Sequence, residues 1–123
     1  MTAVGINGLG RIGRLLARRL YERDDARRAL ELVMCNEVAD VETVVHLLKY
    51  DSTHGRFSHP VAFEKGGLRI ADRFSHLSHE TEPSNVHWGD RGVDVVIDCT
   101  GAEFSHASAS AHLGNGVSRV LLS

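Results

Sequence analysis

The chain has 123 residues and a formal net charge of −2, with 42% hydrophobic and 24% charged residues, which is typical of one soluble globular domain. Its basic residues are spread out and no stretch approaches the roughly 20 apolar residues of a membrane span, so we expect neither a nucleic-acid nor a membrane partner. We expect no secretory signal, and the two cysteines fit neither a disulfide framework nor a zinc site, which favours a cytoplasmic protein.

Apolar runs alternate with helical stripes along the chain. Residues 2–6 predict a short buried strand, and apolar residues at 12, 15, 16 and 20 predict a helix that the charged run 22–28 ends. The further expected elements are a strand at 30–35, a helix at 41–49, a polar loop at 51–60, a hairpin at 61–70, a strand at 74–79, a loop at 82–85, a strand at 93–99, a helix at 105–113 and a strand at 119–122. This order predicts an α/β fold with a doubly wound, mostly parallel sheet and a small hairpin insertion.

The first expected turn carries the spacing G-x-G-x-x-G at Gly8, Gly10 and Gly13. In a Rossmann-type turn, the first glycine permits the tight bend and the second lets a pyrophosphate approach the backbone. The third lets the helix lie close to the strand, and the helix N-terminus offers N–H groups to the phosphates. Glycine-rich turns also occur for packing alone. A mononucleotide phosphate loop does not fit, because Arg14-Leu15 stands where Lys and Ser or Thr are needed.

Glu37 is a second feature that supports a dinucleotide site at the glycine turn. It follows the apolar run that ends at Asn36, roughly 20 to 30 residues after the glycines, where a dinucleotide-binding unit places its ribose-binding acid. The alternative reading of Glu37 is an exposed loop carboxylate. A carboxylate at this place accepts hydrogen bonds from both ribose hydroxyls and repels a 2′-phosphate, and no arginine stands beside it. The two signals together predict a Rossmann-type domain that prefers NAD to NADP.

Longer segments extend this pattern: INGLGRIGRL, NE after the second strand, LLKYDSTHGRF, PSNVHWGDRGVDVVIDCTG and AHLGNGVSRVLLS. Together they resemble the N-terminal part of the glyceraldehyde-3-phosphate dehydrogenase family over essentially all 123 residues, and KYDSTHGRF is a highly specific match. Glu37 in NEVAD, and the pairing of HLLKYD with VDVVIDCTG, lean towards the closely related erythrose-4-phosphate dehydrogenases. The resemblance leaves both alternatives open.

The resemblance implies the NAD-binding portion of a phosphorylating aldehyde dehydrogenase that acts on a sugar-phosphate aldehyde, as in glycolysis, and we expect a homo-oligomer. It places the pyrophosphate against Asn7, Gly8, Gly10, Arg11 and Ile12, the adenosine ribose against Glu37, and the nicotinamide side against Thr100, Gly101 and Ser123. Three positions depart from the family: Leu9 replaces the common Phe, Thr81 a usual Arg near the adenine, and Glu103 a usual aromatic residue near the nicotinamide. These departures concern the affinity for NAD more than the identity of the cofactor.

We expect no catalytic residue and no metal site within the chain. By the resemblance, the nucleophilic cysteine of a SCTTNC-like segment, the base histidine and the second domain follow Ser123, so residues 1–123 form an NAD-binding domain that is incomplete at its C-terminus. A nucleophilic cysteine needs a nearby histidine, which the motifs provide for neither Cys99 nor Cys35. The eight histidines lack metal-ligand spacing. The alternatives are a stand-alone module that binds a nucleotide without chemistry and a remnant that binds nothing.

Overall fold

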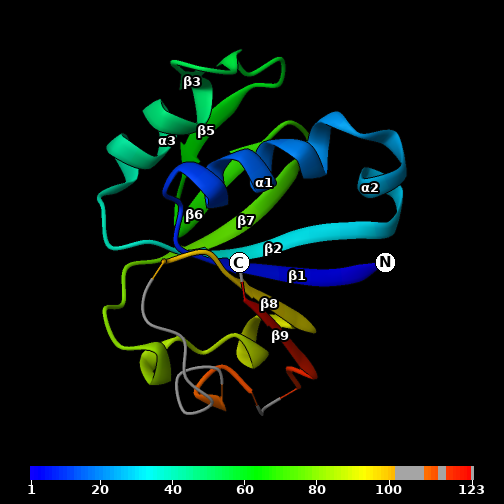
Figure 1. Ribbon diagram of the computed structural model, residues 1–123, viewed down its shortest axis with the longest axis vertical. Helices are drawn as coiled ribbons and strands as arrows, with labels where there is room; N and C mark the ends of the chain where they lie inside the picture. Colours follow the sequence, from blue (N-terminus) through cyan, green and yellow to red (C-terminus); the bar gives the residue numbers. More distant parts are fainter. Residues whose placement is uncertain (102–109, 114–115, 123) are drawn as a thin grey trace.

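The computed structural model describes residues 1–101, 110–113 and 116–122, whose arrangement Figure 1 shows. The helices are α1 (Arg11–Glu22), α2 (Asp24–Ala29) and α3 (Val41–Lys49), with 3-10 turns η1 (Pro83–Asn85) and η2 (Gly89–Arg91). The strands are β1 (Thr2–Asn7), β2 (Leu30–Asn36), β3 (Tyr50–Asp51), β4 (Gly55–Arg56), β5 (Val61–Glu64), β6 (Gly67–Ile70), β7 (Arg73–Ser78), β8 (Val95–Asp98) and β9 (Arg119–Leu122).

The described strands form a seven-stranded sheet in the order β5-β6-β7-β2-β1-β8-β9, while β3 and β4 pair separately. Neighbours from β7 to β9 are parallel, and the β5–β6 hairpin extends the sheet antiparallel to β7. This confirms the predicted doubly wound α/β fold with its hairpin insertion. Because parallel strands align their carboxyl ends, the segments that follow β7, β2, β1 and β8 meet at one edge of the sheet.

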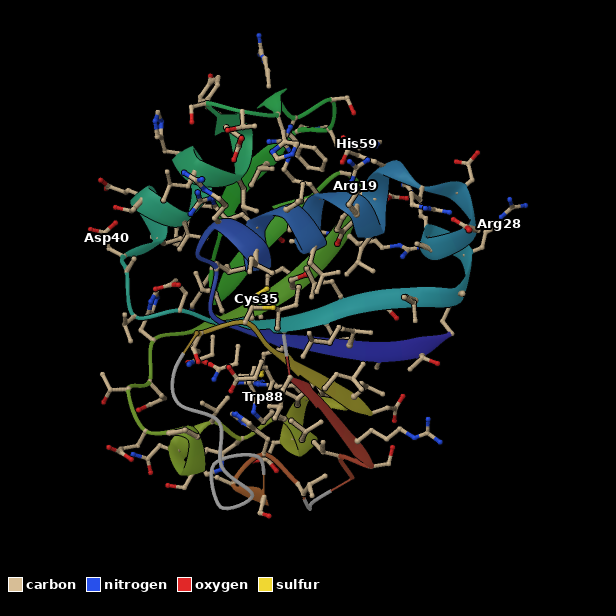
Figure 2. The ribbon with its side chains drawn as sticks, viewed as in Figure 1. Arg19, Arg28, Cys35, Asp40, His59 and Trp88 are labelled. Carbon is tan, nitrogen blue, oxygen red and sulfur yellow. The ribbon has the colours of Figure 1, made fainter. Side chains whose placement is uncertain are left out.

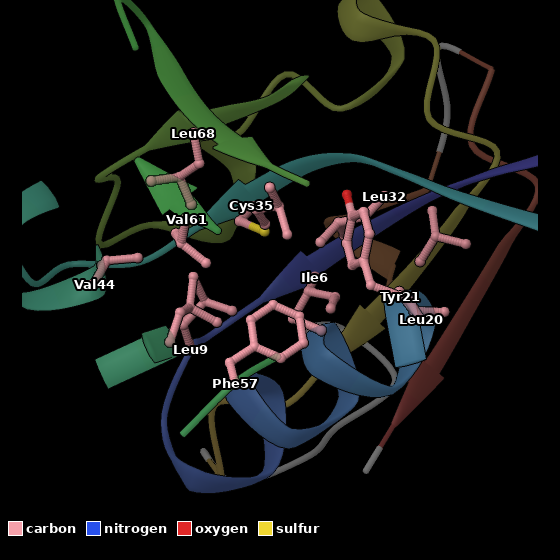
Figure 3. Packing of buried hydrophobic residues seen from close by; sticks show 14 of the residues in the cluster. Ile6, Leu9, Leu20, Tyr21, Leu32, Cys35, Val44, Phe57, Val61 and Leu68 are labelled. Atoms are coloured by element: carbon pink, nitrogen blue, oxygen red, sulfur yellow. The ribbon is translucent and has the colours of Figure 1, made fainter. Parts of the chain in front are cut away.

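Successive side chains of a strand point to opposite faces of the sheet, and a hydrophobic cluster covers each face. In β1, Ile6 points into the larger hydrophobic cluster, to which α1 contributes Leu20 and α3 contributes Val44 (Figure 3). Its neighbour Gly5 faces the other way, where a Cβ would lie 2.6 Å from the Trp88 ring. Trp88 belongs to the smaller cluster, together with valines of β8 and of the segment before β9. The sheet therefore separates two cores.

The charged run 22–28 contains α2, although the sequence predicts only the end of a helix there. Arg23 is extended, with φ −96° and ψ 124°, and separates α1 from α2. The Arg73 guanidinium in β7 donates to the carbonyl oxygens of Arg27 at 2.8 Å and Leu30 at 3.0 Å. These contacts cap the end of α2 from residues 43 and 46 positions away, which no local pattern reveals.

Two smaller predictions differ from the structure, and a third falls mostly on residues that the structure does not describe. The loop predicted at 51–60 includes part of the β3–β4 hairpin, and Phe57 is buried with the Arg18 guanidinium 5.2 Å from its ring centroid. Ile12, predicted on the buried stripe of α1, is 57% exposed. The helix predicted at 105–113 lies mostly outside the described residues. In the described part of the chain, no helix combines the length and apolar character needed to cross a bilayer.

Candidate functional site

The turn between β1 and α1 uses its three glycines in different ways. Gly8 has φ 93°, a left-handed conformation that favours glycine, and its N–H donates to the Asn36 carbonyl at 2.8 Å. A Cβ at Gly13 would lie 1.9 Å from the Gly8 carbonyl oxygen, so α1 approaches the turn too closely for a side chain. A Cβ at Gly10 would meet nothing within 4 Å. The space over Gly10 is open to a ligand that must reach the backbone.

The first turn of α1 borders this open space. Gly10 is the N-cap without a side-chain hydrogen bond, and the first turn holds no acidic residue. The first N–H groups of a helix lack intrahelical acceptors, and the macrodipole gives that end a partial positive charge. Arg11 and Ile12 are both exposed there. The helix end therefore offers hydrogen-bond donors, a cation and an apolar side chain to an anionic ligand.

The Glu37 carboxylate joins this turn to the segment after β2. Its Oε1 accepts a hydrogen bond from Leu9 N at 2.8 Å, and its Oε2 accepts one from Ala39 N at 2.9 Å. A carboxylate oxygen can accept more than one hydrogen bond, so each oxygen keeps acceptor capacity for a hydroxyl. His79, predicted within a strand but lying just after β7, places its Nδ1 at 2.8 Å from the carbonyl oxygens of both Glu37 and Ala39. Glu37 is thus held in a fixed orientation beside the glycine turn.

Hydrogen-bonded polar side chains line the carboxyl ends of four neighbouring strands. Ser78 Oγ donates to Asn36 Oδ1 at 2.7 Å, and Asn36 Nδ2 donates to Asn7 Oδ1 at 2.9 Å. Asn7 Nδ2 in turn donates to Asp98 Oδ2 at 3.2 Å. Asp98 is further hydrogen-bonded to Thr100 and His112, and His112 to Trp88. We call these seven side chains the edge network: Ser78, Asn36, Asn7, Asp98, Thr100, His112 and Trp88. It crosses the sheet in the strand order β7, β2, β1, β8, directly beneath the candidate site.

Asp98 receives hydrogen bonds on both oxygens of its carboxylate. Oδ1 accepts from Thr100 N at 3.0 Å and from Thr100 Oγ1 at 2.7 Å. Oδ2 accepts from Asn7 and contacts His112 Nε2 at 2.9 Å. Burial raises the pKa of Asp98, but the hydrogen bonds from Thr100, His112 and Asn7 outweigh it and hold the pKa below its usual range. Asp98 is therefore ionised at neutral pH.

The structure brings most of the residues that the resemblance assigns to the cofactor to one edge of the sheet. They are Asn7, Gly8, Gly10, Arg11, Ile12, Glu37, Thr100 and Gly101. The Cα of Thr100 would lie 3.0 Å from a Cβ at Gly8, so the segment after β8 touches the glycine turn. Asn7 is 5% exposed, and its side chain holds neighbouring strands together within the edge network. Ser123 and Glu103 lie outside the described residues, while Thr81 is exposed in the loop after β7.

Neither Asp98 nor His112 is among the site residues predicted from the sequence. The signal at Asp98 is a carboxylate at the end of an apolar strand, a position that is costly unless donors surround it. His112 is 2% exposed and contacts Asp98, 14 residues earlier. Its sequence context, an Ala- and Ser-rich segment expected to be helical, contains no signal for this contact.

Both cysteines are buried thiols in the larger cluster. Burial, with a smaller contribution from the nearby Cys99 thiol, raises the pKa of Cys35 to about 12. Cys35 lies beneath α1 in Figure 2, while Trp88 lies on the other side of β1. A buried thiol that stays protonated is not a nucleophile. Within the described residues, no group of three or more His, Cys, Asp or Glu side chains is arranged to hold a metal ion.

The open space at Gly10, the helix end beside it and the acceptor capacity of Glu37 together fit a dinucleotide, with phosphates at the turn and ribose at the carboxylate. A family model agrees with this geometry and with the motifs: residues 2–106 match the model described as glyceraldehyde 3-phosphate dehydrogenase, NAD binding domain. The match covers more than half of the chain and confirms the Rossmann-type fold. The chain therefore belongs to the family of glyceraldehyde 3-phosphate dehydrogenase NAD-binding domains, and its cofactor is NAD.

Proposed function

We propose that this chain is the NAD-binding portion of a phosphorylating aldehyde dehydrogenase that acts on glyceraldehyde 3-phosphate or erythrose 4-phosphate. The observation that carries the proposal is the turn at Gly10, which is open to a ligand and borders a helix end without acidic residues. The family match supports an oxidoreductase that depends on NAD. The sugar-phosphate substrate, the place in glycolysis and the cytoplasm as compartment are inferred from the motifs of the sequence.

Each part of the edge has a role in this proposal. The N–H groups at Gly10 and the first turn of α1 bind the pyrophosphate, with Arg11 adding charge and Ile12 an apolar contact. Glu37 accepts hydrogen bonds from the adenosine ribose. Thr100 and Gly101 border the nicotinamide side, where Ser123 is also proposed to lie. When bound, NAD supplies the hydride acceptor, and these residues orient it.

We further infer that the chain binds NAD without turning over an aldehyde. The chemistry of this enzyme class needs a thiolate to attack the aldehyde and a base to remove the hydroxyl proton. Cys35 is buried with a pKa of about 12, and Cys99 is 8% exposed. Both thiols are buried in the larger hydrophobic cluster, which disfavours the thiolate form that attack on an aldehyde requires.

A titration with NAD tests the binding proposal. Gly10→Val places a branched side chain in the space that the pyrophosphate needs, so the affinity for NAD should fall at least about tenfold while the chain stays folded. Ala62→Val also introduces a valine, at an exposed position of β5 away from the turn, and should bind NAD like the parent chain. Equal NAD affinity in the parent and a folded Gly10→Val chain would show that the turn serves packing alone.

An absorbance assay for NADH, with phosphate and each aldehyde in turn, tests the second inference. No NADH should form with the parent chain at concentrations where NAD is bound. Cys99→Ser serves as the parallel variant and should behave in the same way. Turnover by the parent that disappears in Cys99→Ser would assign catalysis to that cysteine and overturn the inference.

A further inference from the structure

We propose that His112 is a positioning residue for the NAD site: as the neutral tautomer protonated on Nε2, it fixes Asp98 and thereby sets Thr100 against the glycine turn. This inference rests on the proposed function, because Thr100 is a proposed neighbour of the nicotinamide. It adds a segment near the end of the described chain to the determinants of NAD affinity.

The partners of the imidazole define its tautomer. Trp88 Nε1 donates to His112 Nδ1 at 3.0 Å, and an indole N–H can only donate. Nδ1 must therefore carry a lone pair and no proton. The neutral ring then has its proton on Nε2, which lies 2.9 Å from Asp98 Oδ2 and donates to it. Trp88 thus selects the tautomer that Asp98 requires.

The side chains of Trp88, His112 and Asp98 are all buried. Trp88 and His112 are each 2% exposed and Asp98 is 7% exposed. The Trp88 ring is itself fixed, since it packs against Gly5 so closely that a Cβ there would lie 2.6 Å from the ring. A buried donor or acceptor that loses its partner cannot easily replace it with water. The position of the His112 imidazole therefore constrains the orientation of the Asp98 carboxylate.

Asp98 carries this constraint to the site. Two donors, from His112 and Asn7, hold Oδ2, while the backbone N–H and hydroxyl of Thr100 both donate to Oδ1. Without the His112 donor, Oδ2 keeps the 3.2 Å hydrogen bond from Asn7 but loses the shorter one, so the carboxylate is held less firmly about its bond to Cβ. Any turn of the carboxylate displaces the Oδ1 acceptor of both Thr100 hydrogen bonds. Thr100 would contact a Cβ at Gly8 at 3.0 Å, so its displacement also disturbs the glycine turn. Thr100 is exposed at this edge, where the nicotinamide is proposed to bind.

Two substitutions separate the two hydrogen bonds of His112. In Asn the amide oxygen is attached to Cγ, as Nδ1 is in His, so His112→Asn keeps an acceptor for Trp88 but loses the donor to Asp98. In Gln the amide nitrogen lies one atom further out, near the place of Nε2, so His112→Gln keeps the donor to Asp98 but loses the acceptor for Trp88. Both variants lose one buried hydrogen bond and ring volume, so a purely structural role predicts similar effects.

The positioning role predicts different effects on NAD binding. In a titration of the full chain, His112→Asn should weaken NAD binding about tenfold, the loss expected for one buried hydrogen bond that orients the site. His112→Gln should retain most of the affinity although its unfolding midpoint also falls. His87→Asn, an exposed histidine one residue before Trp88, is the control and should bind NAD like the parent. Equal losses of NAD affinity in His112→Asn and His112→Gln, or no loss in either, would overturn the proposal.

Nuclear magnetic resonance of the free chain gives a readout that does not depend on NAD. The indole N–H of Trp88, the only tryptophan, should shift in His112→Gln and stay near its parent position in His112→Asn. The Thr100 amide should show the opposite pattern. A parent chain that binds no NAD but shows both patterns refutes the proposed function and leaves the positioning contact supported. A parent chain that binds NAD without these patterns refutes the positioning contact alone.

Discussion

Single residues in the first turn have separable consequences for stability. A methyl group at Gly13 would meet the Gly8 carbonyl oxygen at 1.9 Å, whereas one at Gly10 meets nothing within 4 Å. We expect Gly13→Ala to lower the free energy of unfolding by about 1–3 kcal/mol, the usual cost of overpacking. Gly10→Ala is the matched control and should lose less than about 1 kcal/mol, since only N-cap preference changes. Urea unfolding measures both, and similar losses would contradict the close approach of α1 to the turn.

The charge of Glu37 should decide between the two nicotinamide cofactors. The carboxylate can accept from ribose hydroxyls but repels a 2′-phosphate, so the parent chain should bind NAD more tightly than NADP. Glu37→Gln removes the charge and keeps one acceptor oxygen, so the ratio of the two affinities should move towards one.

The ratio of the two cofactor affinities, measured in one variant, is the informative quantity. Glu37 also accepts from Leu9 N and Ala39 N, so the substitution weakens the turn for both cofactors, and this loss cancels in the ratio. Equal binding of NAD and NADP by the parent chain would count against the role of Glu37 at the ribose.

At the same scale, the site residues that the sequence predicts belong to a recognisable motif, whereas Asp98 and His112 belong to none. The spacing of the glycines and of Glu37 after predicted strands identifies them in the sequence, and the structure brings them together around Leu9. Asp98 ends β8, and His112, in the segment before β9, folds back to contact it. The two residues are 14 positions apart, and no helical or strand spacing links them.

Among the elements, α2 depends on a contact from another part of the fold. Arg73 in β7 donates to two carbonyl oxygens at the end of α2, where helical carbonyls lack partners. Arg73→Met keeps most of the aliphatic stem and removes both donors, so the free energy of unfolding should fall by about 1–3 kcal/mol.

Arg28→Met is the matched control for this prediction. Arg28 is exposed and labelled in Figure 2, and its Nε donates to Asp24 O at 3.2 Å within the same helix. The change at this exposed position should stay within about 0.5 kcal/mol. If urea unfolding gives equal losses for Arg73→Met and Arg28→Met, α2 is not held by β7.

The elements that the sequence predicted well are those whose pattern is complete within themselves. The helix expected at 41–49 coincides with α3, because its apolar stripe has helical spacing and the Asp40 side chain accepts from Thr43 N at 2.8 Å. The hairpin at 61–70 follows from Lys65-Gly66, where Gly66 has φ 84°. By contrast, Phe57 is buried beside Arg18 of α1, and the polar run around it conceals both this contact and the β3–β4 pairing.

At the scale of the whole molecule, the edge network explains how one sheet holds a site built from distant segments. The loops after β2, β1 and β8 carry the proposed ligand contacts, and these strands and β7 each end in a side chain of the network. Buried, fully bonded polar groups have strict geometric requirements, so they fix the relative positions of these loops more tightly than apolar packing alone. The sequence predicted a mostly parallel sheet but not the side chains that hydrogen-bond across its carboxyl edge.

The two outer strands of the described sheet determine how the molecule behaves in solution. On β9, Leu121 is 53% and Leu122 45% exposed, and no described strand pairs with its outer side. At the opposite edge, Phe63 on β5 is 64% exposed. Unpaired backbone groups beside exposed apolar side chains favour pairing with a second chain. We therefore expect the chain to self-associate, with a sedimentation coefficient that rises over about a hundredfold range of concentration.

Substitutions at each edge identify the surface involved in this association. Leu121→Lys places a charge on β9 and should shift the chain towards the monomer, because a charged edge resists pairing with another strand. Phe63→Lys makes the same test at β5 and should have the smaller effect, since Phe63 lies on one strand of a hairpin whereas Leu121 and Leu122 are adjacent on β9. A parent chain that stays monomeric over the whole range contradicts the expectation. A larger effect of Phe63→Lys than of Leu121→Lys moves the association to the hairpin edge.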